Sequence, residues 1–165
     1  MDIFLEKIVR RKKTPLDITY MTMLFIAALL ASYFVFLFLG AFAPIVIAGL
    51  FYLAYYLASM RNIEFEYIVT NGDLDIDMIV NQRKRKRVFT ANCKEFEVVA
   101  RVNSDQYASH IGQNSKVLDY SSNDPKTEKW FISMTQEGTR KVIIFEPEER
   151  MIDNFRTFIP RKVFK

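Results

Sequence analysis

The chain has 165 residues, of which 50% are hydrophobic and 25% are charged, and its formal net charge is +4. These averages suit a soluble domain, yet all 23 basic and 19 acidic residues lie outside residues 18–60. A soluble domain of this length cannot bury so long a stretch without one charged side chain, so the composition excludes a uniform globular fold. The sequence predicts a membrane segment joined to a charged domain, residues 61–165.

Residues 1–17 form the first predicted segment, a basic flank on the cytoplasmic side of a membrane. We expect this flank to be solvated and to act only by orienting the segment that follows. The alternative is a short helix lying in the membrane surface, with apolar side chains down and basic ones toward phosphate groups. The apolar set would be Ile3, Phe4, Ile8 and Val9, and the basic set is Lys7, Arg10, Arg11, Lys12 and Lys13.

Residues 18–60 predict a transmembrane hairpin with helices at about 18–39 and 43–60, because roughly 20 residues cross a bilayer. Gly40 and Pro44 suit the connecting turn. Basic residues flank both ends and none lies in the turn, so the positive-inside rule predicts two spans of the cell membrane with both termini cytoplasmic. A re-entrant hairpin that stops short of the far surface is the alternative. A cleaved signal peptide is disfavoured because the apolar stretch is too long.

Small residues recur at four-residue spacing in both predicted helices: Ala27 and Ala31, then Ala54 and Ala58. This spacing lets helix backbones approach closely, within the hairpin or against another membrane protein. Ordinary composition accounts for the same alanines equally well.

The domain after the hairpin opens with an alternating pattern that predicts two antiparallel strands. Apolar side chains alternate with acidic ones around Asn71–Gly72, a dipeptide typical of two-residue turns. Such a turn pairs Val69 with Leu74 and puts one wholly apolar face on the sheet. It also places Glu66 opposite Asp77, a like-charge pair that normally destabilises a sheet.

Five consecutive basic residues begin the third predicted strand: Arg83, Lys84, Arg85, Lys86 and Arg87. Salt bridges to the acidic second strand are one interpretation. The other is a patch for anionic phospholipid headgroups or a protein partner, since a domain near the inner leaflet meets headgroups at high local concentration. Because five consecutive residues cannot all face one strand, salt bridges do not account for the whole run. Nucleic acid is not an expected partner, because no aromatic residues interleave the run.

Further strands are predicted at 94–102, 129–135 and 139–146, with a polar loop at 103–126 that contains one short strand near 117–120. In the first of these strands one face would carry Phe96, Val98, Ala100 and Val102.

The last predicted element is an amphipathic helix at about 147–159. Pro147 fits its first turn and Pro160 ends it. Its single apolar stripe must pack on the strands and consists of Met151, Ile152, Phe155, Phe158 and Ile159.

The whole chain resembles the small bacterial membrane proteins in which a two-helix hairpin precedes a bacterial pleckstrin-homology-like (PH-like) domain. The resemblance is carried by Met1–Phe4 with its Arg/Lys run, Tyr67–Asp77, the basic run to Arg87, Cys93–Glu97 and Ile144–Pro147. It implies an α+β fold: a transmembrane α-helical hairpin, then an antiparallel β sandwich or barrel capped by a C-terminal amphipathic helix. It implies no catalytic residue, and PH-like folds often bind proteins rather than phosphoinositides.

No residue pattern predicts catalysis, a cofactor or a metal site, so an enzyme is not expected. Cys93 and His110 are the sole cysteine and histidine, and nothing else marks them as a catalytic dyad. Asp73, Asp75 and Asp77 alternate along one strand and spread over about 13 Å, rather than converging on a cation.

We therefore expect a membrane-anchored, non-catalytic binding or scaffolding protein that presents a cytoplasmic PH-like domain to a protein partner or to anionic lipid. The alternative is a small accessory or regulatory subunit of a larger membrane complex, assembled through the hairpin. Beyond the lipid bilayer, the partner predicted is an unidentified protein or a second copy of the chain.

Overall fold

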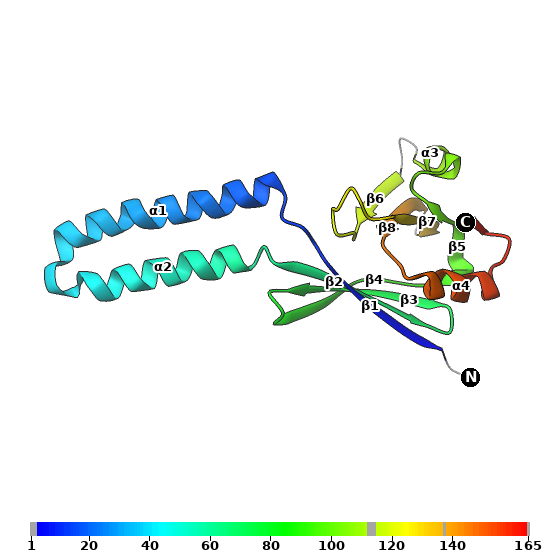
Figure 1. The fold of residues 1–165 in the computed structure, drawn as a ribbon, viewed down its shortest axis with the longest axis horizontal. Coiled ribbons are helices and arrows are strands. Elements are labelled where there is room, and N and C mark those ends of the chain that lie inside the picture. The colour runs from blue at the N-terminus through cyan, green and yellow to red at the C-terminus, as the bar shows by residue number, and fades with distance from the viewer. Residues whose placement is uncertain (1–2, 112–114, 137, 165) are drawn as a thin grey trace.

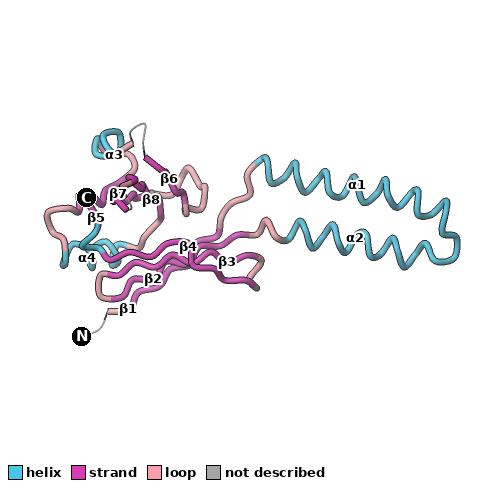
Figure 2. The backbone as a smooth tube through the Cα atoms, turned by 180° about the vertical axis from the view of Figure 1, so that it is seen from behind, coloured by secondary structure: helices cyan, strands magenta, loops and turns pink. Residues whose placement is uncertain are grey.

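The computed structural model describes residues 3–111, 115–136 and 138–164. It consists of a long helical arm and a domain built from two β-sheets (Figure 1). The arm comprises helix α1 (Pro15–Leu39), the short 3-10 helix η1 (Gly40–Phe42) and helix α2 (Ala43–Ser59). The chain reverses direction at η1, so α1 and α2 lie side by side and project away from the sheets (Figures 1 and 2).

The helical arm begins and ends where the sequence supplies caps. Thr14 is the N-cap of α1 and forms a reciprocal capping box with Asp17, while Pro15 occupies the first turn. The helix ends at Gly40, whose positive φ of 51° suits a residue without a Cβ. By length and composition, Pro15–Ser59 is the one helical stretch in the described part of the chain that is able to cross a membrane, with a mean hydropathy of 2.5.

Small side chains are buried within the helical arm. Ala54 and Ala58 of α2 are both buried, as is Ala28 of α1, whereas Ala27 is exposed and Ala31 is half-buried. The small-residue face predicted on α2 is therefore present. On α1 the buried alanine is Ala28, one residue along from the predicted Ala27. The buried alanines are used for packing inside this chain.

The first sheet contains strands β1 (Phe4–Arg10), β2 (Ile63–Thr70), β3 (Asp73–Val80) and β4 (Lys84–Asn92), in that order and all antiparallel. The predicted register is confirmed, because Val69 pairs with Leu74 and Glu66 pairs with Asp77. Asn71–Gly72 forms the two-residue turn, with both residues at positive φ. The apolar face of this pair of strands lies in the core.

Residues 4–10 form strand β1 rather than a solvated flank or a surface helix. This strand pairs with β2 along its whole length. Val9 is buried in the core and Leu5 packs against it, whereas Phe4 and Ile8 face outward and are exposed. The helical arm is thus inserted between the first two strands of one sheet, and the domain needs its N-terminal segment to complete that sheet.

The second sheet has the strand order β6-β8-β7-β5-β9. It is mixed rather than wholly antiparallel, because β6 pairs with β8, and β9 with β5, in parallel. The predicted loop contains helix α3 (Asp105–His110) as well as a strand, and the 3-10 helix η2 (Cys93–Glu95) precedes β5. The strands are β5 (Phe96–Arg101), β6 (Ser115–Asp119), β7 (Trp130–Gln136), β8 (Thr139–Phe145) and β9 (Val163–Phe164).

A β-bulge in β5 divides the residues that we expected on one face. Phe96 and Val99 lie in the core between the sheets, whereas Val98 and Ala100 lie in a smaller cluster on the other face of the second sheet. The register shifts between Phe96 and Val98, and an extra residue in one strand reverses the alternation beyond it.

Helix α4 (Glu149–Phe158) packs into the core between the two sheets. The ring of Phe155 meets that of Phe96 edge-on, with 5.6 Å between centroids. Pro147 stands before the N-cap Glu148 rather than in the first turn. The predicted apolar stripe is buried except at Phe158, and its buried members are Met151, Ile152, Phe155 and Ile159.

Replacing Gly72 with alanine should lower the free energy of unfolding by about 2 kcal/mol. Gly72 has a φ of +90°, and a Cβ there would lie 2.8 Å from the sulfur of Cys93. Gly138 offers a matched control, because its φ is +73° but no described atom lies within 4 Å of its Cβ position. Denaturant unfolding of the full chain in detergent should show a larger loss for Gly72→Ala than for Gly138→Ala. Equal losses would contradict the steric explanation.

Candidate binding surface at the base of the arm

Two members of the predicted basic run are bound to the acidic strands beside them. Arg85 pairs with Glu66 at 2.7 Å. Arg87 bridges Asp75 and Asp77, at 2.7 and 2.8 Å. These contacts are the cross-strand salt bridges that one interpretation of the run predicted.

The other three members of the run lie elsewhere. Arg83 is in the turn between β3 and β4, and Lys84 and Lys86 take the positions of β4 that alternate with Arg85 and Arg87. All five side chains are exposed, and no ion pair with another described residue involves Arg83, Lys84 or Lys86. The run therefore does not form one surface, and its binding of anionic lipid stays a prediction.

A buried like-charge pair lies beneath these arginines. Glu66 and Asp77 face each other across β2 and β3 and are 1% and 4% exposed. Arg85 binds one carboxylate oxygen of Glu66, while the other, Oε2, has no hydrogen-bond partner among the described residues. Burial raises the pKa of Glu66, and the carboxyl of Glu6 on β1 raises this pKa further.

We expect Glu66→Gln to raise the free energy of unfolding by about 1 kcal/mol near neutral pH, because an amide keeps the Arg85 contact and removes a buried like charge. Because the pKa of Glu66 is raised in the folded protein, its carboxyl there keeps a proton at a pH where the same carboxyl in the unfolded chain has lost it. The contribution of Glu66 to the free energy of unfolding therefore falls as the pH rises from the ordinary glutamate pKa through the raised pKa. The stability of Glu66→Gln relative to the parent protein should increase over that pH range.

Unfolding of both proteins from acidic to neutral pH measures this effect. The exposed Glu95→Gln substitution is the control and should show no such trend. A stability difference between Glu66→Gln and the parent that does not change with pH would contradict the assignment.

A buried carboxylate joins the two ends of the arm. Asp17, in the first turn of α1, lies 3.1 Å from Arg11 in the linker before α1 and 3.6 Å from Arg61 just after α2. Its side chain also accepts hydrogen bonds from the backbone and hydroxyl of Thr14. The guanidinium of Arg61 lies 4.5 Å from the centre of the Tyr20 ring. We call these contacts the Asp17 clasp.

Sequence reasoning missed the Asp17 clasp. The spacing of Thr14 and Asp17, directly before an apolar stretch, is that of a capping box and could have identified the carboxylate. No sequence pattern could have predicted the contact of Arg61 with Asp17, because the whole arm separates these two residues along the chain.

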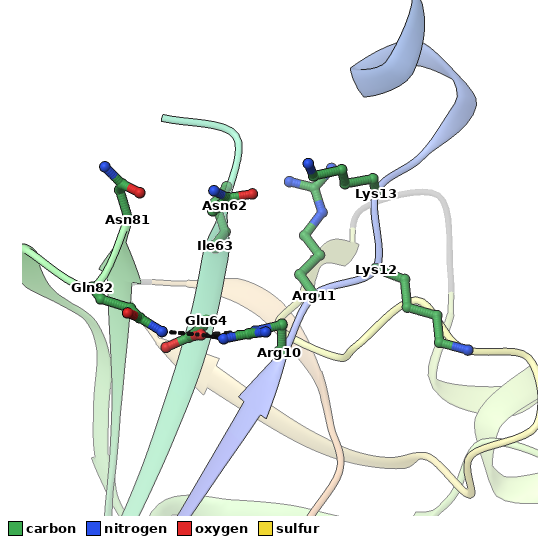
Figure 3. Close-up of a pocket in the computed structure, with 9 residues that line it drawn as sticks. All are labelled: Arg10, Arg11, Lys12, Lys13, Asn62, Ile63, Glu64, Asn81 and Gln82. Atoms are coloured by element: carbon green, nitrogen blue, oxygen red, sulfur yellow. Dashed lines mark hydrogen bonds and ion pairs between the residues drawn. The ribbon is translucent and has the colours of Figure 1, made fainter. Parts of the chain in front are cut away.

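A pocket of about 590 Å³ opens beside the Asp17 clasp, at the end of the first sheet nearest the arm (Figure 3). We call it the base pocket. It is lined by the linker before α1, the start of β2 and the β3–β4 turn: Arg10, Arg11, Lys12, Lys13, Asn62, Ile63, Glu64, Asn81 and Gln82.

The charges of the base pocket are only partly paired. Glu64 binds Arg10 at 2.8 Å and accepts a longer hydrogen bond from Gln82 at 3.4 Å. Lys12 points away from these residues to Asp124, at 2.5 Å (Figure 3). The side chains of Arg11 and Asn81 extend away from the sheet (Figure 3).

The structure does not bring Cys93 and His110 together. Cys93 is buried in the core between the sheets, where burial raises the pKa of its thiol. His110 ends α3 and lies beside Phe131, on the opposite face of the second sheet. The alternating aspartates of β3 are bound to side chains of β4. Within the described residues, no group of three acidic, histidine or cysteine side chains is placed to hold a metal ion.

Comparison with known proteins agrees with this architecture. No curated protein and no solved structure matches the chain significantly. The family model described as "Bacterial PH-like domain (DUF6106)" matches residues 1–165. Two sheets closed by a C-terminal helix are consistent with that description. The chain therefore belongs to this family of bacterial PH-like proteins.

Proposed function

We propose that this protein anchors a non-catalytic PH-like binding module to the cytoplasmic surface of the cell membrane. In this proposal α1 and α2 cross the bilayer as a two-helix hairpin. The observation that carries it is the exposure of large apolar side chains along the arm, for example Leu16, Phe38 and Ile45 at 81%, 80% and 75%. Each such side chain gains about 1.5–3 kcal/mol when it leaves water, and lipid provides that environment for all of them at once.

Charge at the two ends of the arm supports the orientation. Arg11, Lys12, Lys13 and Arg61 lie at its base, whereas the turn Gly40–Phe42 carries no charge. Positive charge favours the cytoplasmic side, so both termini and the domain would share that side. The Asp17 clasp supports this placement, because it neutralises the one carboxylate of α1 with two arginines.

The domain would bind its partner through surfaces that the fold leaves exposed. Phe4 and Ile8 on the outer face of the edge strand β1 are 63% and 55% exposed and provide apolar contact area. Arg83, Lys84 and Lys86 add positive charge at the arm-proximal end of β4. These features suit a protein partner or an anionic surface.

Carbonate extraction of membranes from cells that express the full chain tests the anchoring. We expect the full chain to stay in the membrane pellet. The matched control is the arm-replaced chain, in which a short Gly–Ser linker joins residues 1–13 to residues 62–165. This variant should be released, and release of the full chain as well would contradict the proposal.

The same pair of chains separates a binding module from an accessory subunit assembled through the arm. Partners that are recovered from detergent with both chains support the module. Partners that are recovered only with the full chain support the subunit.

A further inference from the structure

We propose that the free edge of strand β1 binds an extended segment of a partner membrane protein, which adds to the first sheet as a further antiparallel strand. This inference rests on the proposed function and deepens it, because insertion of the arm fixes the direction in which the partner strand must run. The segment leaves the bilayer from the end of a transmembrane helix and continues into the cytoplasm.

The backbone of β1 directs unused hydrogen-bonding groups to one side, because β1 is an edge strand of the first sheet. The carbonyl of Ile3 accepts a hydrogen bond from the backbone of Asn71, and the backbone of Arg11 donates one to the carbonyl of Ile63. Such pairs alternate along an antiparallel strand, so the odd-numbered residues of β1 bond to β2. The N–H and C=O groups of the even-numbered residues therefore point to the free side: Phe4, Glu6, Ile8 and Arg10.

The free side of β1 is accessible. All four even-numbered residues are exposed, and no contact within the described part of the chain occupies their backbone groups on this side. Apolar side chains flank the edge, since Phe4 and Ile8 are 63% and 55% exposed. An open edge beside exposed apolar side chains is a surface that another strand can join.

The other described sheet edges are short or protected. At the opposite edge of the first sheet, β4 begins with basic residues and its pairing with β3 contains a β-bulge, and both features discourage a further strand. In the second sheet, β9 covers the edge of β5 but has only two residues, and β6 has five. β1 has seven residues in unbroken register, which makes it the longest regular edge.

The membrane fixes the direction of the partner strand. The arm leaves one end of the first sheet, and β1 runs toward that end whereas β2 runs away from it (Figures 1 and 2). An antiparallel partner of β1 therefore runs away from the membrane, as β2 does after α2. A second copy of the chain does not fit this edge. Two-fold pairing of β1 with itself would point the two arms in opposite directions, and one membrane cannot hold both.

Lys7 determines the chemistry of the partner strand. It is half-buried on the face of β1 turned to the core, and its ammonium lies 3.5 Å from the carbonyl of Pro147. A strand that covers the edge buries this charge further, which is costly unless a carboxylate pairs with it. We therefore expect an acidic residue opposite Lys7 and apolar residues opposite Ile8 and Phe4. In an antiparallel strand, one apolar residue directly precedes the acidic one and the other follows it three positions later.

Hydrogen–deuterium exchange of the full chain in nanodiscs, resolved to single amides, tests the proposal. The probe is a co-expressed transmembrane helix that carries a threonine-rich peptide at its cytoplasmic C-terminus. Valine, aspartate and valine in the peptide are placed opposite Ile8, Lys7 and Phe4. We expect exchange of the even-numbered amides of β1 to slow about ten-fold. The odd-numbered amides already bond to β2 and should change by less than about two-fold.

Three controls separate strand addition from other contacts. Ile8→Pro removes one outward N–H and should abolish the slowing, while protected odd-numbered amides show that β1 still pairs with β2. Ile8→Thr should remove most of the slowing, whereas Ile79→Thr, the same change two strands from the edge, should leave it within about two-fold. A reversed probe carries the peptide before its transmembrane helix, so that the peptide runs toward the membrane, and should give no slowing.

The remaining outcomes each overturn a stated part of the proposal. No slowing, slowing spread equally over even and odd amides, or equal losses in Ile8→Thr and Ile79→Thr would overturn strand addition and leave the anchoring intact. Equal slowing by both probes would overturn the assigned direction. Protection of the even-numbered amides without a probe, rising with the number of chains in each nanodisc, would assign the edge to a second copy. A chain that does not enter nanodiscs would overturn the proposed function itself.

Discussion

Residues 62–165 alone should be far less stable than the arm-replaced chain, although the two differ only by the N-terminal segment and a linker. The fragment lacks β1, whose Val9 is buried in the core and whose Leu5 packs against it. Loss of these contacts should lower the free energy of unfolding by about 3–5 kcal/mol. The arm-replaced chain keeps β1, and a short linker suffices because the backbone of Arg11 donates a hydrogen bond to the carbonyl of Ile63 at 2.9 Å.

Circular dichroism and denaturant unfolding of the two purified proteins measure the difference. We expect a cooperative transition for the arm-replaced chain and a weak or absent one, with aggregation, for residues 62–165. The exposed edge of β2 favours that aggregation. Equal stability would show that β1 contributes little and that the domain is complete without it.

Tyr67→Phe should lower the free energy of unfolding by about 2–4 kcal/mol, because it removes the hydrogen bonds that its hydroxyl makes with one buried and one partly buried backbone group. The hydroxyl of Tyr67 donates to the carbonyl of Tyr120 at 2.6 Å and accepts from the backbone of Glu146 at 3.3 Å. These contacts link the first sheet to segments that adjoin the second. Burial also raises the pKa of Tyr67, so the hydroxyl keeps the proton that it donates.

Tyr107→Phe is the matched control for this substitution. Tyr107 on α3 packs its ring on Phe131 at 5.1 Å between centroids, and its hydroxyl makes no hydrogen bond with another described residue. Removing that hydroxyl should change the free energy of unfolding by less than about 0.5 kcal/mol. Thermal unfolding in detergent that shows equal shifts for the two variants would contradict the role of Tyr67.

The register of β2 and β3 was predictable because two local signals agree. Asn71–Gly72 favours a two-residue turn, and the alternation on both sides puts one apolar face inward. The apolar stripe of α4 followed in the same way from spacing alone, except that Phe158 is exposed. These elements depend on neighbours in the sequence, which a pattern can show.

The features that escaped prediction depend on distant segments. β1 pairs with β2 across the entire arm, and it presents only Leu5 and Val9 as inward apolar residues, too few for a clear strand pattern. The parallel pairing of β9 with β5 is equally remote in sequence. The bulge after Phe96 leaves no mark in the alternation, which continues through Val98 and Ala100.

In the candidate site, too, local features were predictable from the sequence and contacts between distant segments were not. The run of basic residues was evident from the sequence, and so was the acidic strand that binds Arg85 and Arg87. The base pocket was not, because the linker, the start of β2 and the β3–β4 turn meet only in the fold. Its basic lining from Arg10 to Lys13 had been assigned to membrane topology, with a helix in the membrane surface as the alternative.

Cysteine labelling in intact cells tests the central claim, that the arm crosses the membrane and leaves the domain in the cytoplasm. In a Cys93→Ala background, Ala41→Cys places a thiol in η1, and Lys126→Cys places one in an exposed loop of the domain. A membrane-impermeant maleimide should label residue 41 in intact cells and residue 126 only after permeabilisation. Protection of residue 41 from the outside would contradict two full spans, and labelling of residue 126 in intact cells would contradict the cytoplasmic domain.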